Sequence, residues 1–330
     1  MTSLYVDRRG VTLKADGEAL VFFENGERVG TVPLAPLSRV FLRGDVTLSS
    51  SLLGKLGERR IGVVVLSGRK AEPTMLLGRP HNDAARRVAQ YRLSLDGDFC
   101  LRFSRAIVEA KLRAQATFLA ERRDTEPMSR YVLTVAGRRL DSAIAAVDEQ
   151  ASIGCLRGLE GAGAATYFGG FGDLLPPRLK FSHRNRRPPK DPVNAVLSLG
   201  YTLLHAEAVL ALFGAGLDPF IGFYHALDFG RESLACDIVE PLRIEVDRHA
   251  LMLFRTEKLR MDDFSMTDGA CLLGKAGRTR FYAEWECLAE RLRKQLTASI
   301  ADVSAAICLT GVVAVAPVVD ATPSQDNGAY

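Results

Sequence analysis

The sequence changes character near residue 81, and this change constrains the fold more than any other feature of the chain. Before it, short runs rich in Val, Leu, Phe and Tyr are separated by turn signals at hairpin-like spacing. Those turn signals are Arg9-Gly10, Asp16-Gly17 and Asn25-Gly26. A short helical period at 50–58 is followed by an apolar run at 61–66 that is typical of a buried strand. Residues 1–80 are therefore predicted to form a small, sandwich-like β domain with one short helix.

Beyond residue 81 the apolar residues recur with the period of an α-helix. The helical periods that dominate this half cover 99–123, 129–147, 193–212 and 281–304. We therefore expect an α+β protein, in which the β domain is followed by a larger all-α domain at 96–319. Residues 81–95 are expected to be the linker and the start of the helical region. The polar, turn-rich segment 320–330 is expected to be a disordered tail.

Length and composition set outer limits on the class of protein. With 330 residues, 47% of them hydrophobic and 25% charged, the chain is expected to be a packed globular protein with two domains. None of the six cysteines has the close spacing of a metal site, so free thiols in a reducing compartment are expected. Residues 1–8 lack an apolar signal core, and no apolar run is long enough to span a bilayer. We expect a cytoplasmic protein that does not contact membranes.

A basic segment at 178–190 is the first candidate for function. The net charge of +4 alone would not indicate nucleic acid, but here six cations occur with no acid before Asp191. They are Arg178, Lys180, Arg184, Arg186, Arg187 and Lys190. Such a loop suits a DNA phosphate backbone, although a solvated surface loop is the alternative. A helix resumes at once, at Asn194, so the loop is expected to lie against a structured element.

A second candidate is Glu160, which precedes a run of small residues at 161–165 and then Tyr167-Phe168. Two glycines in a helix cost roughly 1 kcal/mol each relative to alanine, so they need a reason in packing or access. Small residues allow the close approach of a neighbouring helix or of a DNA backbone. The alternative is tight helix packing with Glu160 on the surface.

A third candidate combines a histidine with two acids. His225 lies among aromatic residues just before a glycine-containing loop, where an imidazole can be buried on one side and open on the other. Asp237 and Glu240 are three residues apart, so their carboxylates share a helix face and repel unless a cation lies between them. The alternatives are a satisfied core histidine and a solvated acidic face paired with Arg231 or Arg243.

Two carboxylates and one imidazole are a plausible set of ligands for a divalent ion. Oxygen ligands suit Mg²⁺, and the imidazole shifts the preference toward Mn²⁺. A site with few protein ligands leaves coordination positions open for water and a phosphate oxygen, which phosphodiester chemistry requires. The spacing alone leaves open whether Asp237 or Glu240 is the third ligand.

At these residues the chain resembles a known family, the CRISPR-associated integrases that acquire new spacers, the first of the numbered Cas proteins. The resemblance covers nearly the whole chain and is densest from Gly222 to Arg243. Further matching stretches are Glu160-Gly161 with Tyr167-Phe168, residues 184–189 with Asp191 and Asn194, residues 199–204, Asp262-Asp263-Phe264, and Gly277-Arg278. Mild departures are Gly163, the glycines at 169–172, and Tyr224.

The resemblance implies a site and partners. The implied metal ligands are Glu160, His225 and Glu240, and Asp237 matches an acid that supports the site. Arg178, Lys180, Arg184, Arg186, Arg187, Lys190 and Asn194 would bind DNA. The implied partners are double-stranded DNA (protospacer and CRISPR repeat), a second copy forming a homodimer through the β domain, and the small second Cas protein, which joins two dimers in a heterohexamer.

The chemistry expected from this resemblance is phosphoryl transfer with Mg²⁺ or Mn²⁺. The metal would neutralise charge on the scissile phosphate, and the nucleophile would be a DNA 3′-hydroxyl in an integrase. Two other functions stay open. A nuclease acting on branched repair intermediates would use water at the same site, and a DNA-binding scaffold without catalysis would use the acids structurally.

Overall fold

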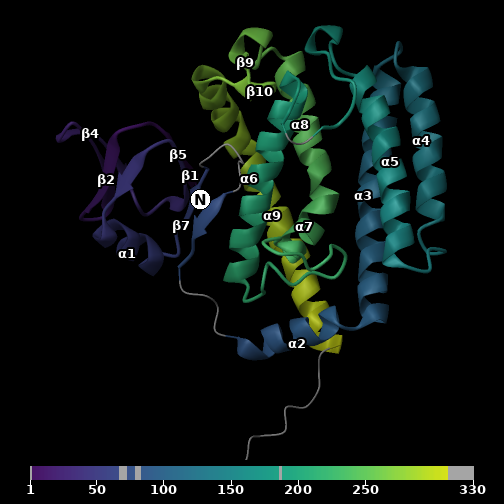
Figure 1. Ribbon diagram of the computed structural model, residues 1–330, viewed down its shortest axis with the longest axis horizontal. Helices are drawn as coiled ribbons and strands as arrows, with labels where there is room; N and C mark the ends of the chain where they lie inside the picture. The colour runs from purple at the N-terminus through teal and green to yellow at the C-terminus, as the bar shows by residue number, and fades with distance from the viewer. Residues whose placement is uncertain (1, 67–72, 79–82, 186–187, 311–330) are drawn as a thin grey trace, which may run out of the picture.

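Two four-stranded sheets make up the N-terminal part of the computed structural model, which describes residues 2–66, 73–78, 83–185 and 188–310 (Figure 1). One sheet has the order β1-β5-β7-β8 and the other the order β4-β3-β2-β6. Their bounds are β1 Thr2–Asp7, β5 Leu37–Arg43, β7 Gly62–Val65 and β8 Thr74–Leu76, then β4 Glu27–Pro33, β3 Ala19–Glu24, β2 Val11–Asp16 and β6 Val46–Leu48. Helix α1, Ser50–Glu58, is the predicted short helix.

The predicted turns and buried strand explain this sandwich. Gly17 and Gly26 have φ of +54° and +86°, values that the hairpins β2–β3 and β3–β4 require. Leu13 and Leu20 from one sheet meet Val40 and Val63 from the other in a core of their own. The expected sandwich-like β domain with one short helix is confirmed.

The other face of the β1-β5-β7-β8 sheet is covered by the helical part of the chain. Phe41 and Val64 belong to the core of that part, and the Tyr5 ring stacks between Phe41 and Tyr282, with centroids 4.9 and 4.6 Å away. Glu207 on α6, fully buried, is in ion pairs with Arg39 of β5 and Arg293 of α9. The sheet therefore lies between two cores, and the two regions are packed rather than tethered.

Helices dominate the second half, as predicted. Their bounds are α2 Ala84–Ser94, α3 Gly97–Thr125, α4 Arg130–Ala145, α5 Ile153–Asp173, α6 Pro192–Gly214, α7 Ser233–Val239, α8 Arg243–Arg255 and α9 Lys275–Thr310. Most of the expected linker, 81–95, is helix α2, which Asp83 caps by accepting a hydrogen bond from the Arg86 N–H. The expected disordered tail, 320–330, lies outside the described residues.

One hairpin departs from an all-α second domain. Strands β9 (Phe264–Thr267) and β10 (Ala270–Leu273) pair through a turn at Asp268-Gly269, with φ of 52° and 75°. Asp-Gly between two short apolar runs is a strong hairpin signal that the sequence interpretation missed. The fold is α+β with a mostly helical second domain.

Helix α6 runs through the middle of the helical domain (Figure 1). It is the one described helix that is long and apolar enough to span a membrane by length and composition, with a mean hydropathy of 1.6. It packs against α7, α8 and α9, and 56% of its most apolar window is buried inside the protein. A core helix accounts for this composition.

Candidate active site

Helix α5 carries Glu160. Some of its glycines lie against neighbouring helices, and others face open space. A Cβ on Gly163 would lie 2.5 Å from Leu112 of α3, and one on Gly170 would lie 3.3 Å from Leu119. These glycines let α5 pack closely on its neighbours. By contrast, a Cβ on Gly161 or Gly169 would meet nothing within 4 Å. The predicted close approach of neighbouring helices is therefore confirmed at Gly163 and Gly170, while another face of α5 stays open.

Asp237 fixes the loop that carries His225. Its carboxylate is fully buried in α7 and accepts hydrogen bonds from the backbone N–H groups of Phe223 (2.7 Å), Tyr224 (3.1 Å) and His225 (2.9 Å). It also contacts the His225 ring at Nδ1, at 2.7 Å. Only glycine fits at position 222, since a Cβ there would lie 2.7 Å from Asp237 Oδ2. Asp237 thus holds the imidazole so that Nε2 faces away from it.

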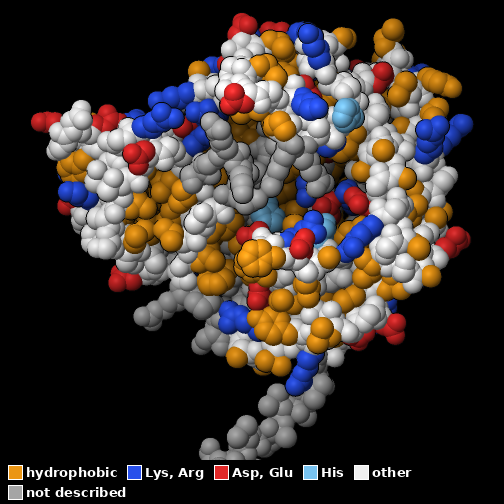
Figure 2. All heavy atoms as spheres, viewed as in Figure 1, with side chains coloured by type: hydrophobic (Ala, Val, Ile, Leu, Met, Phe, Trp, Pro, Cys, Tyr) orange, Lys and Arg blue, Asp and Glu red, His pale blue; other side chains and the backbone are white. Residues whose placement is uncertain are grey.

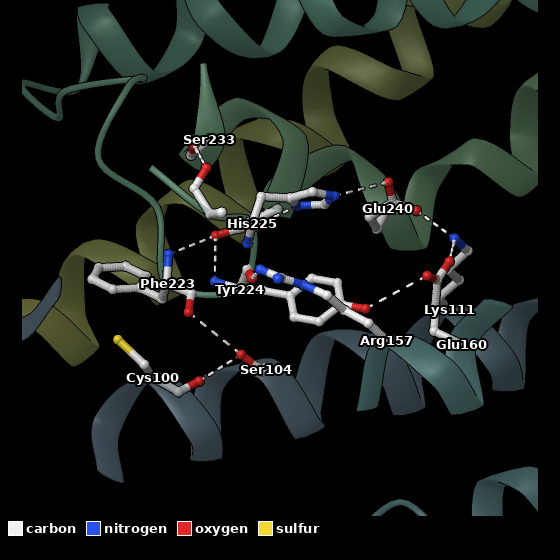
Figure 3. A network of polar contacts seen from close by, with 12 residues as sticks. Cys100, Ser104, Lys111, Arg157, Glu160, Phe223, Tyr224, His225, Ser233 and Glu240 are labelled. Carbon is white, nitrogen blue, oxygen red and sulfur yellow. Dashed lines mark hydrogen bonds and ion pairs between the residues drawn. The ribbon is translucent and has the colours of Figure 1, made fainter. Parts of the chain in front are cut away.

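Glu160, His225 and Glu240 come together, as predicted, from α5, the loop before α7 and the 3-10 helix Glu240–Leu242 that follows α7. His225 Nε2 lies 3.9 Å from Glu240 Oε1 (Figure 3). The Tyr224 hydroxyl lies 3.5 Å from Glu160 Oε2. Asp237, the fourth predicted residue, lies behind the histidine, with its oxygens occupied by the loop.

Lys111, which the sequence interpretation missed, lies between the two acids. Its ammonium is 2.6 Å from Glu240 Oε2 and also pairs with Glu160 Oε1 (Figure 3). Arg243 Nε donates to Glu240 Oε1 at 3.0 Å. Burial alone would raise the pKa of the Glu240 carboxyl, but the charges of Arg243 and Lys111 outweigh it and hold the pKa at about 2.

The residues present suit a divalent cation. Two carboxylates face the position that the Lys111 ammonium occupies, and His225 Nε2 lies beside the other oxygen of Glu240. Within the described ranges, no three His, Cys, Asp or Glu side chains are gathered closely enough to form a ready metal cluster. Lys111 accounts for the absence of such a cluster, because its ammonium occupies the position between the carboxylates.

A pocket of about 390 Å³ opens beside this site. Its lining runs from Lys111 and Glu160 to Arg184, Tyr201 and Asp247. Figure 2 shows acidic, basic and histidine side chains gathered at a hollow in the front of the helical domain. The pocket therefore joins the acidic site to the basic segment.

The basic segment divides into three groups. Arg178, Lys180 and Lys190 are exposed to solvent. Arg184 turns inward, where it donates to Asn194 Oδ1 (2.7 Å) and lies over the Tyr201 ring. Arg186 and Arg187 lie outside the described residues.

The prediction that Asn194 contacts DNA is wrong. Its side chain is fully buried, and its amide group forms hydrogen bonds within the protein. The amide oxygen accepts from Asn185 N (3.0 Å) as well as from Arg184, and the amide nitrogen donates to the His183 carbonyl (2.9 Å) and to Asp191. Asn194 clamps the basic segment to α6 and so directs Arg184 into the pocket.

Asp247 is a buried acid at the inner end of this pocket that the sequence interpretation also missed. It accepts a hydrogen bond from the Tyr201 hydroxyl. Burial raises the pKa of its carboxyl to about 6, against the lowering effect of Tyr201 and of the nearby Arg184 and Arg243. The ordinary value is 3.8, so folding takes up a proton between about pH 4 and pH 6.

Replacing Asp247 with asparagine is therefore expected to stabilise the protein at neutral pH. In the wild type, the free energy of unfolding falls as pH rises through this window, because the unfolded carboxyl ionises first. The neutral amide of Asp247→Asn removes that loss of unfolding free energy, which is on the order of 2 kcal/mol. Denaturant unfolding at pH 4 to 7 measures it, with the exposed Asp302→Asn as control. Parallel stability profiles of the wild type and Asp247→Asn would contradict this account.

Comparison with known proteins agrees with the fold. The family described as "CRISPR associated protein Cas1" matches residues 4–287. A CRISPR-associated endonuclease Cas1 of Thermodesulfovibrio yellowstonii is 41% identical over 289 residues, which cover 87% of this chain and 91% of the relative.

Two solved structures have the same fold. A Cas1 protein from Thermotoga maritima has a TM-score of 0.82 at 22% identity, covering 93% of this chain and 97% of its own. A chain of a Cas6-RT-Cas1–Cas2 complex has a TM-score of 0.79 at 25% identity, covering 94% of this chain and 35% of its own.

Together the fold and the match to the family place the chain in the class of CRISPR-associated endonucleases. The chain belongs to the Cas1 family. The resemblance inferred from the sequence is thereby confirmed.

Proposed function

We propose that this protein joins new spacers to a CRISPR array by phosphoryl transfer on DNA, with Mg²⁺ or Mn²⁺ held by Glu160, His225 and Glu240. One observation carries the proposal: Glu160 and Glu240 share the Lys111 ammonium, and His225 Nε2 lies beside the other oxygen of Glu240, next to a basic pocket. When bound there, a divalent ion would supply neutralisation of charge on the scissile phosphate and the leaving oxygen.

The protein's own residues position this reaction. Asp237 keeps His225 Nδ1 occupied, so that Nε2 is the nitrogen left to bind. Arg243 holds Glu240 by a hydrogen bond, and Arg184 presents its charge to the pocket from the clamped basic segment. Exposed Arg178, Lys180 and Lys190 would hold DNA phosphates farther out, and Arg186 and Arg187 are proposed to bind DNA as well.

Lys111 has to leave the position between the acids when a cation binds. Its side chain is long and flexible, and the incoming cation would replace its charge, whereas two acids without any cation would repel each other strongly. We propose that Lys111 keeps the site ordered until metal and DNA arrive together.

The partners that this function requires are also proposals. The Cas6-RT-Cas1–Cas2 complex, in which a chain shares this fold, supports a small Cas2-type partner, and family membership supports a homodimer formed through the β domain. The substrates would be protospacer and repeat DNA in the cytoplasm.

The decisive assay uses a DNA with a free 3′-hydroxyl and a supercoiled plasmid that carries a repeat, incubated with Mn²⁺ and the Cas2-type partner. Joined products support integration. Cleavage of branched DNA without joined products would instead indicate a repair nuclease. DNA binding with no metal-dependent change in the DNA would indicate a scaffold.

Asp237→Asn tests the positioning role separately from metal binding. An asparagine places an N–H where the carboxylate accepts from the loop, so the His225 loop should loosen without losing a ligand. Residues that orient a metal ligand by a hydrogen bond typically contribute about 10- to 100-fold to activity, so a loss of that size is expected. Metal titration of the rate should show weaker Mn²⁺ dependence, and excess Mn²⁺ should restore part of the activity. Complete inactivity at every Mn²⁺ concentration would show that Asp237 is itself a ligand.

A further inference from the structure

Two loops of the β domain bring arginines together at one end of the sandwich. Strands β1 and β5 are parallel neighbours with Asp7 opposite Arg43, so the turns that follow them lie side by side. The Arg8 N–H donates to the Arg43 carbonyl at 3.2 Å, and the Gly10 N–H donates to the Asp45 carbonyl at 2.9 Å. Arg8, Arg9 and Arg43 are therefore held close to one another by backbone hydrogen bonds.

The start of helix α9 faces these turns. Arg278 donates from Nε to Asp7 Oδ2 at 2.5 Å and from Nη1 to the Leu273 carbonyl at 2.6 Å, which joins the helix to the end of β1. Lys275, the first residue of α9, is exposed, and the first turn contains no acid. The positive end of the helix thus adds to the charge of the arginines.

Two openings of about 790 and 850 Å³ lie in this region, and both are lined by Asp7, Arg8, Arg9 and Lys275. Since they share these residues, they form one cleft between the β domain and α9. We call it the interdomain basic cleft, and its cations are Arg8, Arg9, Arg43, Lys275 and Arg278.

The ion pairs in the cleft leave an excess of positive charge. Three of the acids that line the cleft already form ion pairs: Asp7 with Arg278, Glu24 with Arg8, and Glu286 with Arg293. In the part of the chain that the structure describes, Arg9, Arg43 and Lys275 form no ion pair, and Asp45 is the one lining acid that forms none. Three unpaired cations therefore face one unpaired acid.

We propose that the interdomain basic cleft binds the phosphate backbone of DNA, as a second contact outside the pocket beside Glu160. The inference rests on the proposed function only in taking DNA as the ligand. The cleft is far larger than one phosphate ion, and its cations come from three separate segments, so it suits consecutive phosphates of a strand. Contacts of this kind hold and orient DNA without reading its sequence.

The test compares the full-length wild type with Arg9→Ala/Lys275→Ala, which leaves the ion pairs of Arg8 and Arg278 in place. Arg92→Ala/Arg102→Ala is the matched control, because it removes two exposed cations that form no ion pair within the described ranges. Fluorescence anisotropy with a labelled duplex of about 30 base pairs (about three helical turns) gives the affinity over a range of salt concentrations.

The cleft variant is expected to bind about tenfold more weakly near 0.15 M salt, with a salt-dependence slope smaller by about 2, while the control keeps the wild-type values. Cleavage at saturating DNA should continue at the wild-type rate. If the wild type forms no joined DNA products, the proposed function fails, but the binding comparison still tests the cleft. Wild-type affinity and slope in the cleft variant would overturn the proposal. So would a variant that loses its dimer, measured by light scattering, without weaker DNA binding.

Discussion

His225→Ala is expected to abolish metal-dependent cleavage and strand transfer while leaving DNA binding almost intact. Removing an outer partner of a metal ligand costs about 10- to 100-fold, so removing the ligand itself should cost more than about 100-fold. DNA binding should survive, because the exposed cations Arg178, Lys180 and Lys190 do not depend on the imidazole. Rates with Mn²⁺ and affinities for the same DNA, measured side by side, separate the two effects.

The matched control for His225→Ala is Glu232→Gln. Glu232 lies near the opposite end of the same loop, but its carboxylate contacts His205 Nε2 at 3.0 Å and does not face the site. This control should retain most of the wild-type rate. If His225→Ala is folded, as judged by its melting curve, and still turns over at the wild-type rate, then the metal-site assignment is wrong.

Lys111→Met is expected to destabilise the protein in EDTA and to regain stability when Mn²⁺ is added. The Lys111 side chain is 10% exposed and that of Glu240 is 6% exposed, so the change leaves a buried carboxylate without its ammonium. Breaking a buried pair in this way costs about 3 to 5 kcal/mol. A divalent ion at the same place would replace the lost charge and stabilise the folded state by mass action. Thermal melting with EDTA and with Mn²⁺ measures both effects.

Lys294→Met is the control for that experiment. Lys294 pairs with Glu290 at 3.4 Å, but both side chains are more than two-thirds exposed, and such surface pairs contribute little. Its melting temperature should stay close to that of the wild type under both conditions. A Lys111→Met protein that melts like the wild type in EDTA would show that the two carboxylates do not need a cation there. One that Mn²⁺ fails to stabilise would show that they do not bind the metal.

Acid pH provides a consistency check on the same site. The folded pKa of Glu240 lies below its ordinary value of 4.5, at about 2, so this group contributes stability above about pH 4.5 and loses it progressively toward pH 2. Asp247 acts in the opposite direction between about pH 4 and pH 6. The two buried acids near Arg243 thus have opposite effects on stability, because cations surround Glu240 whereas burial dominates at Asp247.

The sequence predicted the fold class because local patterns decide it. Turn signals such as Asn25-Gly26 require φ values that the hairpins have, and helical periodicity over long segments identified the helical domain. The hairpin β9–β10 was missed although Asp268-Gly269 carries the same kind of signal, because its strands are only four residues long. Asp237 and Glu240 are only three residues apart, yet they have different roles that the sequence did not separate. Asp237 holds the His225 loop, whereas Glu240 faces Lys111.

The sequence alone determined that Glu160, His225 and Glu240 are candidates for one site, since residue type and resemblance to the family pointed to them. Only the tertiary structure decided what lies between them. Lys111 is on α3, 49 positions before Glu160 and 129 before Glu240, and no local pattern ties an ammonium to two carboxylates at such separations. The packing of α3 against α5 and against the 3-10 helix Glu240–Leu242 brings the three together, because the absence of a side chain at Gly163 lets Leu112 approach. The burial of Asn194, which turned an expected DNA contact into a clamp, likewise depends on helix packing rather than on residue type.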